Sequence, residues 1–305
     1  MKMGLTTQFS IPQDPIWQHP PSLFFLGSCF SDEMAKRFSD HSINLLCNPL
    51  GTLFSPESMA KALEILSGKV AANWITDTHN QAICLDVSHK VNKTLDPTKL
   101  NHLQEQFQQF IQKSDTAFIT LGTAFTYWHK ESNQWVGNCH KLPSTDFEKK
   151  LLTVNQIKNC LERITHSVQA INPQMRIIFT VSPVKHLRDG IIENLRSKSN
   201  LLSAVHDFIE ETTGVRYFPS FEIVQEELRD HQFYAADLAH PNEWAADYIF
   251  NRLIETYSDS NFEGYWSEAY KLHTMRQHRL MDQGEQEQWN AAIELQAKLL
   301  ESKYH

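Results

Sequence analysis

Two short segments of this 305-residue chain carry side chains that could together perform nucleophilic catalysis. Gly27 and Ser28 follow an apolar run of strand length, and Phe30, Met34 and Phe38 then recur at helical spacing. A serine at such a turn lies at the carboxyl edge of a sheet, near the positive end of a helix dipole. The tetrapeptide Gly27–Phe30 by itself favours a serine that only caps the helix, after a glycine that only forms a tight turn. A second residue is therefore needed to decide whether Ser28 is a nucleophile.

A serine nucleophile needs a base, usually a histidine whose tautomer is held by a carboxylate. The pattern D-x-x-H occurs at Asp86–His89 and at Asp237–His240. The second pair follows the last apolar run and precedes a helical pattern, and Pro241 disfavours helical geometry at His240. We therefore expect Ser28 to be the nucleophile, His240 the base and Asp237 the orienting carboxylate. Asp86–His89 is not placed between a predicted strand and a predicted helix in this way, and we expect a surface polar pair there.

The elements that would position these side chains alternate along the chain. Apolar runs predict five strands, at residues 23–26, 43–47, 118–121, 177–181 and 215–218. Helical spacing of apolar residues follows the first three of them. Strands this continuously apolar have no solvent-exposed face. Together with the alternating helices, they predict an α/β fold with a mostly parallel sheet covered by helices on both sides. Ligands would bind beyond the carboxyl ends of the strands.

Helix boundaries and long connections complete the organisation. Ser55 and Pro56 suit the start of a helix, and Gly68 and Gly214 suit left-handed C-caps. Residues 70–113, apart from a helical pattern near their end, and residues 122–150 read as long connections, which are usually functional or mobile. After Tyr257 the chain becomes polar with helical content. We predict a catalytic domain over residues 1–257 and a helical extension packed on it over residues 258–305.

Composition narrows the class of protein. The net charge of −8 gives no general attraction to nucleic acid or to anionic membranes. No apolar run approaches 18 residues, and Met1–Ile11 lacks a signal-peptide pattern, so we expect a cytoplasmic protein. Five cysteines without a C-x-x-C pair fit reduced thiols better than disulfides or a zinc site. We expect neither a metal nor a cofactor, and the oligomeric state stays open.

Six blocks of sequence, in order, resemble the GSCFA-domain family, which is grouped with the SGNH/GDSL hydrolases. They are Gly27-Ser28-Cys29-Phe30, Asn48-Pro49-Leu50-Gly51-Thr52, Thr120-Leu121-Gly122-Thr123-Ala124, Asn138-Cys139-His140-Lys141, Ser182-Pro183-Val184-Lys185-His186 and Asp237-x-x-His240-Pro241. The resemblance spans residues 20 to 280. It implies a flavodoxin-like α/β/α fold with Ser28, Asp237 and His240 as the triad. Ser31 departs from the alanine in the family's name but leaves Ser28 in place.

The resemblance also implies an oxyanion site and raises a difficulty there. SGNH enzymes use the backbone N–H of the serine, that of a glycine, and an asparagine side chain. Gly51 matches the glycine, but the third block has no asparagine. The third donor is therefore Thr123, Asn138 or absent, and losing one such donor costs about 10²–10³ in rate. We expect His140 and His186 to contact substrate on the same rim.

The residues, together with the resemblance, lead us to expect ester hydrolysis by a serine hydrolase. The resemblance to the superfamily, rather than any residue, implies an acetyl or similar acyl group on a carbohydrate-like molecule as the substrate. Cys29 beside the serine could instead be a thiol catalyst, but neighbouring residues of a helix point about 100° apart, and we expect Cys29 to pack inward. An acyltransferase using the same triad and a non-catalytic binding module are the alternatives.

Overall fold

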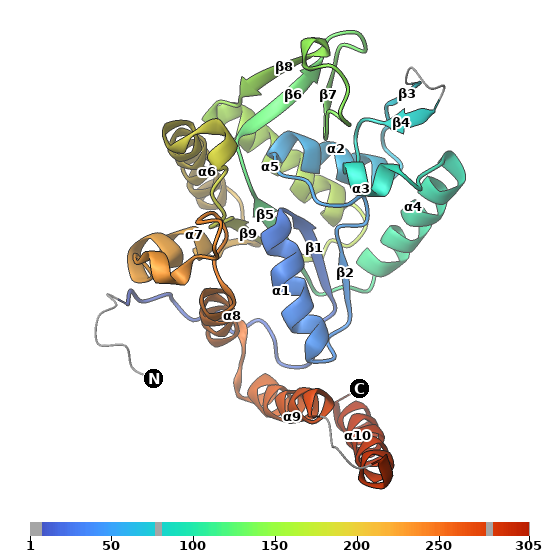
Figure 1. Cartoon of the computed structure of the whole chain (residues 1–305), viewed down its shortest axis with the longest axis vertical. Coiled ribbons are helices and arrows are strands. Elements are labelled where there is room, and N and C mark those ends of the chain that lie inside the picture. Colours follow the sequence, from blue (N-terminus) through green and yellow to red (C-terminus); the bar gives the residue numbers. More distant parts are fainter. Residues whose placement is uncertain (1–7, 77–80, 279–282, 305) are drawn as a thin grey trace.

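A five-stranded, wholly parallel sheet forms the centre of the protein in the computed structural model, which describes residues 8–76, 81–278 and 283–304 (Figure 1). Its strands are β1 (Leu23–Gly27), β2 (Leu45–Cys47), β5 (Thr116–Leu121), β9 (Arg176–Val181) and β10 (Val215–Tyr217). They lie in the order β10-β9-β5-β1-β2. Each overlaps one predicted strand, so the α/β prediction is confirmed.

The strand order determines where a ligand site can lie. Counted within the sheet from β2, the order is 2-1-3-4-5, which is the flavodoxin-like arrangement expected from the resemblance. The chain passes from β1 to β2 on one side and then to β5 on the other. The loops after β1 and β5 therefore diverge at the carboxyl edge, and the residues that follow Gly27 lie at this switch point.

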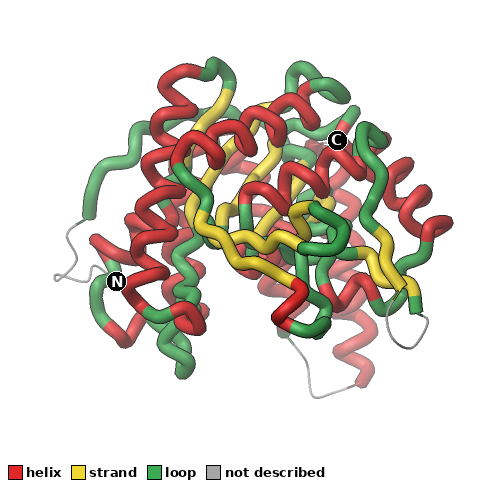
Figure 2. The backbone as a smooth tube through the Cα atoms, turned by 90° about the horizontal axis from the view of Figure 1, so that it is seen from above, coloured by secondary structure: helices red, strands yellow, loops and turns green. Residues whose placement is uncertain are grey.

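Helices cover both faces of the sheet because strand side chains alternate between two apolar clusters (Figure 2). Phe24 and Ile119 belong to one cluster, and Phe25 and Phe118, whose rings stack at 5.0 Å, belong to the other. The first face is covered by α2 (Pro56–Leu66), α4 (Pro97–Ile111), α5 (Val154–Gln169) and α6 (Ile191–Glu211), and the second by α1 (Cys29–Asp40) and α8 (Glu243–Tyr257). The three-layer α/β/α prediction is confirmed.

The predicted helix boundaries hold where capping chemistry determined them. The Ser55 side chain accepts a hydrogen bond from the backbone N–H of Ser58, with Pro56 at the first helical position. Gly68 follows the C-cap of α2 with φ of 75°, a left-handed conformation that glycine takes without a steric penalty. Gly214 also has a positive φ, 80°, but the prediction that it caps a helix is wrong, because α6 ends at Glu211 with Thr212 as its C-cap and Gly214 lies in the turn before β10. The long helix α6 was not marked out by the sequence analysis.

The two long connections contain antiparallel strands that the sequence did not predict. In the first, β3 (Trp74–Thr76) pairs with β4 (Ala82–Cys84), and α3 (His89–Asn92) follows. In the second, β6 (Phe125–His129) lies between β7 (Gln134–Val136) and β8 (Phe147–Leu151). Trp128 faces Trp135 across β6 and β7 with ring centroids 4.9 Å apart. Such strands depend on cross-strand pairs rather than on an apolar run, so the pattern search missed them.

The chain after β10 passes through short helical turns to the carboxyl-terminal helices. The turns are α7 (Ser220–Glu222), η3 (Ile223–Glu227) and η4 (His231–Phe233), with η1 (Ser144–Asp146) and η2 (Leu187–Asp189) earlier in the chain. Helices α9 (Ser260–Gln277) and α10 (Gln283–Tyr304) confirm the expected helical content, and Phe262 and Tyr265 of α9 join the apolar cluster of α1. The domain boundary at residue 257 stays a prediction. No helix among the described residues is both long and apolar enough to cross a bilayer.

Candidate active site

The turn from β1 into α1 places two neighbouring side chains in different surroundings. Gly27 has φ of 140°, and a Cβ there would lie 2.2 Å from the Thr120 carbonyl oxygen, so only glycine allows β1 and β5 to approach this closely. Ser28 is the N-cap of α1 and is 1% exposed. Its Oγ accepts a hydrogen bond from the backbone N–H of Phe30 at 3.3 Å. The serine hydroxyl is therefore turned back onto the helix end.

Cys29, the first residue of α1, faces the histidine instead. Its Sγ lies 3.4 Å from Nε2 of His240, and both residues line a cavity of about 130 Å³. Burial raises the pKa of the Cys29 thiol, and the nearby Asp32 carboxylate raises it further. The backbone N–H groups of Cys29 and Phe30 act in the opposite direction. Cys29 is partly buried against the apolar cluster of α1, as expected, but its sulfur also reaches the imidazole, so the structure brings Cys29, rather than Ser28, to His240.

Asp237 and His240 form the predicted pair on a loop that is tied down at several points. Asp237 Oδ2 lies 2.6 Å from His240 Nδ1, and Oδ1 accepts hydrogen bonds from the backbone N–H groups of Ala239 and His240 at 2.9 and 3.0 Å. These backbone contacts, with that of the imidazole, lower the pKa of Asp237 to about 2. Leu238 supplies the left-handed turn with φ of 54°, and the Lys185 N–H binds the Ala239 carbonyl. The carboxylate thus stays charged and orients the ring.

The groups expected to bind an oxyanion are already engaged. Gly51 N–H donates to the Asn48 carbonyl at 2.7 Å, which closes a turn. Thr123 N–H donates to the Phe54 carbonyl, and its Oγ1 bonds with Ser197 Oγ at 3.0 Å. These groups take part in turn and loop closure, so oxyanion donation by Gly51 or Thr123 gains no support from their contacts.

Asn48 is a residue that the sequence analysis did not single out. Its Oδ1 accepts from the Gly27 N–H at 2.8 Å, and its Nδ2 donates to Asp32 Oδ1 at 2.7 Å. Asn48 has φ of 44°, and asparagine is among the residues that tolerate this left-handed conformation. It therefore joins the loop after β2 to both sides of the turn that carries Cys29. An asparagine before proline at the end of a strand was the available signal.

Asn138 and His186 line a second, larger cavity of about 300 Å³ that lies on the same edge of the sheet. The His186 ring meets Phe54 edge-on with centroids 5.6 Å apart. Burial, with the charge of Lys198, lowers the pKa of His186 to about 4, so the ring is neutral near neutral pH. Asn138 Oδ1 accepts from the His140 N–H at 2.9 Å. Neither residue lines the cavity that holds Cys29 and His240, so Asn138 is not placed as an oxyanion donor.

His140 is placed differently from the prediction. It is buried with φ of 48° and lines neither of these two cavities. Its ring lies beside that of His89, with centroids 5.9 Å apart. Burial lowers its pKa to about 4, with a contribution from His89. The expected substrate contact by His140 is therefore not met, because the loop folds the ring inward.

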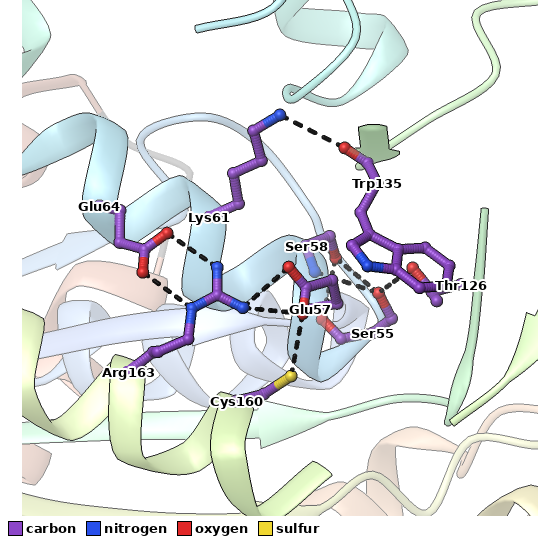
Figure 3. Close-up of polar contacts among 9 residues, drawn as sticks. All are labelled: Ser55, Glu57, Ser58, Lys61, Glu64, Thr126, Trp135, Cys160 and Arg163. Carbon is purple, nitrogen blue, oxygen red and sulfur yellow. Dashed lines mark hydrogen bonds and ion pairs between the residues drawn. The ribbon is translucent and has the colours of Figure 1, made fainter. Parts of the chain in front are cut away.

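Three hydroxyl groups in the lining of the larger cavity form hydrogen bonds with one another (Figure 3). Ser55 Oγ lies 3.0 Å from Ser58 Oγ and 3.2 Å from Thr126 Oγ1. On the far side of α2, Arg163 of α5 binds both Glu57 and Glu64 at 2.8 Å. Figure 3 shows this ion-paired cluster beside the hydroxyl groups. Ion pairs thus hold α2, which carries the Ser58 hydroxyl group, against α5.

The chain matches one protein-family model, that of the GSCFA family, over residues 22–253. The chain belongs to the GSCFA family. The match covers every strand of the parallel sheet and the Asp237–His240 loop of this GSCFA protein. No curated protein matches it. Within the described residues, no group of three or more histidine, cysteine, aspartate or glutamate side chains is arranged to hold a metal ion.

Solved structures similar to this GSCFA protein are distant. A Streptococcus pneumonia protein provisionally described as a platelet activating factor has 14% identity and a TM-score of 0.41, and the match covers 81% of this chain and 84% of that one. A carbohydrate esterase family 3 protein from Talaromyces cellulolyticus has 8% identity and a TM-score of 0.37, with 76% and 94% covered. The acetyl xylan esterase Est2A from Butyrivibrio proteoclasticus has 11% identity and a TM-score of 0.39, with 77% and 63% covered.

Proposed function

We propose that this GSCFA-family protein is an ester hydrolase in which Cys29 is the nucleophile, His240 the general base and Asp237 the orienting carboxylate. The single observation that carries the proposal is the relay from Asp237 Oδ2 to His240 Nδ1 at 2.6 Å and from His240 Nε2 to Cys29 Sγ at 3.4 Å. A base held by a carboxylate and in contact with a thiol is the arrangement that activates a cysteine. The thiol replaces the serine of the sequence-based hypothesis.

The reaction follows from this relay. His240 Nε2 removes the thiol proton as sulfur attacks the ester carbonyl, and the Nδ1–H of His240 donates to Asp237, which stabilises the imidazolium. His240 then protonates the leaving alkoxide as the C–O bond breaks, which leaves a thioester on Cys29. Water, deprotonated by His240, attacks the thioester. The carboxylic acid departs, and the sulfur recovers its proton.

The amino end of α1 supplies the groups that suit the developing oxyanion. The Cys29 N–H lies at the first helical position, where backbone N–H groups have no partner within the helix. The Phe30 N–H donates to Ser28 Oγ at 3.3 Å, so the Cys29 N–H is the donor of this helix end that we assign to the oxyanion. A helix amino terminus favours negative charge. We assign oxyanion binding to this helix end rather than to Gly51, Thr123 or Asn138.

The two cavities support a small acyl group on a polar alcohol. Apolar side chains of Phe30, Val184 and Ala246 line the 130 Å³ cavity beside Cys29, which suits an acetyl or a similar group. The 300 Å³ cavity carries hydroxyl groups and aromatic rings, among them Ser58, Thr126 and Phe54, which together suit a carbohydrate-like alcohol. An O-acetylated carbohydrate is accordingly the proposed substrate class.

The decisive experiment compares p-nitrophenyl acetate hydrolysis by the wild type, Cys29→Ala and Ser28→Ala, with mass spectrometry of quenched protein to locate the acetyl group. We expect Cys29→Ala to lose turnover and acetylation, and Ser28→Ala to retain both. Hydroxylamine at neutral pH should release the acetyl group because a thioester is labile to it. Acetylation of Ser28 that survives in Cys29→Ala would restore the serine hypothesis and overturn the proposal.

The same assay separates the alternatives. When a sugar is added as an acyl acceptor, an esterase still forms mainly acetate. An acyltransferase instead forms more acetylated sugar than acetate. A folded wild-type protein that is neither acetylated nor active would be a binding module. Circular dichroism of each variant confirms that the fold is retained.

A further inference from the structure

Lys198 of α6 is a charged residue buried behind the candidate active site. It is 1% exposed, and its Nζ donates to the carbonyl oxygens of Gly122 at 2.7 Å and Ser182 at 2.6 Å. Within the described part of the chain, no carboxylate lies at ion-pair distance from this ammonium group. A buried charge without a counter-charge is costly, so this arrangement calls for a physical reason.

The sheet register places this ammonium group at the level of the nucleophile. Gly27 pairs with Thr120, and Leu121 pairs with Val181. Gly122 and Ser182 are therefore the first residues beyond the carboxyl ends of β5 and β9, just as Ser28 is the first residue beyond β1. The Lys198 Nζ therefore binds the carboxyl edge of the sheet at the end of β5, which lies next to β1, and at the end of β9, the strand beyond β5.

The charges of Lys198 and Cys29 influence each other. Burial lowers the pKa of Lys198 to about 7, and the Cys29 sulfur acts to raise it. Lys198 in turn acts to lower the pKa of the thiol, against burial and Asp32. Lys198 also acts to lower the pKa of His186, whose main cause of lowering is burial. The mutual influence of Cys29 and Lys198 has the sign expected for a thiolate and an ammonium group that stabilise each other.

The neighbours of Lys198 show that holding the loops does not itself require a charge. Ser197 Oγ accepts from the Ala124 N–H at 2.7 Å, and Asn194 Oδ1 accepts from the His186 N–H at 2.8 Å. These neutral side chains on the same helix fasten the loops after β5 and β9. Lys198 brings an ionisable amine to this edge instead, bound to the Gly122 and Ser182 carbonyls.

We propose that Lys198 is a positioning residue that acts as the buried counter-charge of the Cys29 thiolate and of the anionic tetrahedral adduct. The inference rests on the proposed nucleophilic role of Cys29. The ammonium group acts through space on the sulfur while the Gly122 and Ser182 carbonyls hold it at the sheet edge. Its charge offsets the burial that otherwise disfavours the thiolate.

The test measures the alkylation of Cys29 by iodoacetamide as a function of pH, quantified on the Cys29 peptide by mass spectrometry. Lys198→Met deletes the charge and the hydrogen bonds, Lys198→Gln keeps amide donors without the charge, and Lys185→Met removes a lysine from the same rim. We expect both Lys198 variants to raise the apparent pKa of the thiol and to slow its alkylation near neutral pH about tenfold, as one pKa unit implies. Lys185→Met should stay near the wild-type rate.

A wild-type profile in folded Lys198→Gln would overturn the proposal and leave a hydrogen-bonding role only. If neither Lys198 variant folds, the test uses the wild-type protein instead. NMR of its ¹³C-labelled lysine side chains then measures the pKa of Lys198. Alkylation of Cys29 with iodoacetate, which adds a carboxylate, should raise the pKa of Lys198 above its value after alkylation with neutral iodoacetamide. Equal values would refute the counter-charge.

Alkylation does not depend on ester turnover. An unchanged profile therefore rejects this inference, whereas ester turnover retained in Cys29→Ala rejects the proposed function.

Discussion

The two D-x-x-H pairs of this chain have the same spacing and opposite surroundings. Asp86 is 1% exposed, forms an ion pair with Lys61 at 2.9 Å and accepts from the Asn73 N–H. Asp237 and His240 are about half exposed on a loop at the sheet edge, and their side chains bind each other. The prediction that Asp86–His89 is a surface pair is wrong, because the segment after β4 turns Asp86 inward, where it meets Lys61 of α2.

The difference shows how the surroundings of a carboxylate determine its role. Burial raises the pKa of Asp86 in spite of Lys61, whereas hydrogen bonds from backbone N–H groups lower that of Asp237 to about 2. His89 begins the short helix α3, and its ring lies beside His140. Asp86 therefore holds a connection to α2 through Lys61, whereas Asp237 and His240 bind each other at the sheet edge, where we propose that they act as orienting carboxylate and base.

The largest expected effect separates the two histidines. His240→Ala should lower p-nitrophenyl acetate turnover by about 10²–10⁴, the usual contribution of a general base. His89→Ala should leave turnover within about twofold, since substitutions away from the reacting atoms have small effects. Steady-state kinetics of both variants, with melting curves as the control, provide the comparison. Equal losses would remove the distinction between the pairs.

The two carboxylates should differ in their effect on stability. Asp86→Asn leaves Lys61 without its buried partner, although Lys61 keeps a bond to Gln134. We expect a loss of about 1–3 kcal/mol in the free energy of unfolding, below the range for a wholly buried pair. Asp237→Asn should instead affect mainly turnover. Urea unfolding of both variants tests this, and a stability loss in Asp237→Asn as large as that in Asp86→Asn would contradict it.

The pH dependence of those stability losses should have opposite signs. Asp237 has a lowered pKa when folded, so its contribution to stability is present above the unfolded pKa, about 4, and is lost as pH falls through about 2. Asp86 has a raised pKa when folded, so the stability linked to its protonation is present at low pH and is lost as pH rises through that value. On acidification the effect of Asp237→Asn should therefore shrink and that of Asp86→Asn should grow. If the stability losses of the two variants changed in parallel with pH, this prediction would be wrong.

The smallest expected effect concerns the capping serines of the same two regions. Ser28 Oγ accepts from the Phe30 N–H, and Ser88 Oγ accepts from the Val91 N–H at 3.4 Å. Ser28→Ala and Ser88→Ala should each lower stability by about 1 kcal/mol, the usual loss of an N-cap. Ser28→Ala should change turnover less than tenfold because Ser28 is the cap and Cys29 the nucleophile. Thermal melts with the esterase assay measure both.

The parallel sheet was predictable because its signals are local. The runs at β1, β5 and β9 are continuously apolar, and Ser55 with Pro56 marks a helix start by chemistry that needs no distant partner. The antiparallel strands β6 and β7 were not predictable in this way. Their pairing depends on contacts such as that of Trp128 with Trp135, which a pattern along one segment does not contain.

Part of the candidate site was also within reach of the sequence. Asp237 and His240 were predicted as a pair, and they bind each other. The identity of the side chain that meets the base was missed, although the preference of serine for the N-cap was a signal that Ser28 would turn back to the helix. Lys198 was missed as well, even though Asn194, Ser197 and Lys198 form a polar stripe beside the apolar Leu201 in α6.

The sequence by itself determined the sheet, the strand-to-helix turn after Gly27 and the short carboxylate–imidazole unit, since each depends on residues close together in the chain. Only the tertiary structure decided that a sulfur, and not a hydroxyl group, meets the imidazole, and that a buried lysine binds the ends of β5 and β9. The reason is that both contacts join loops from different strands. Their directions depend on how β1, β5 and β9 align and on how the Asp237 loop is tied to Lys185.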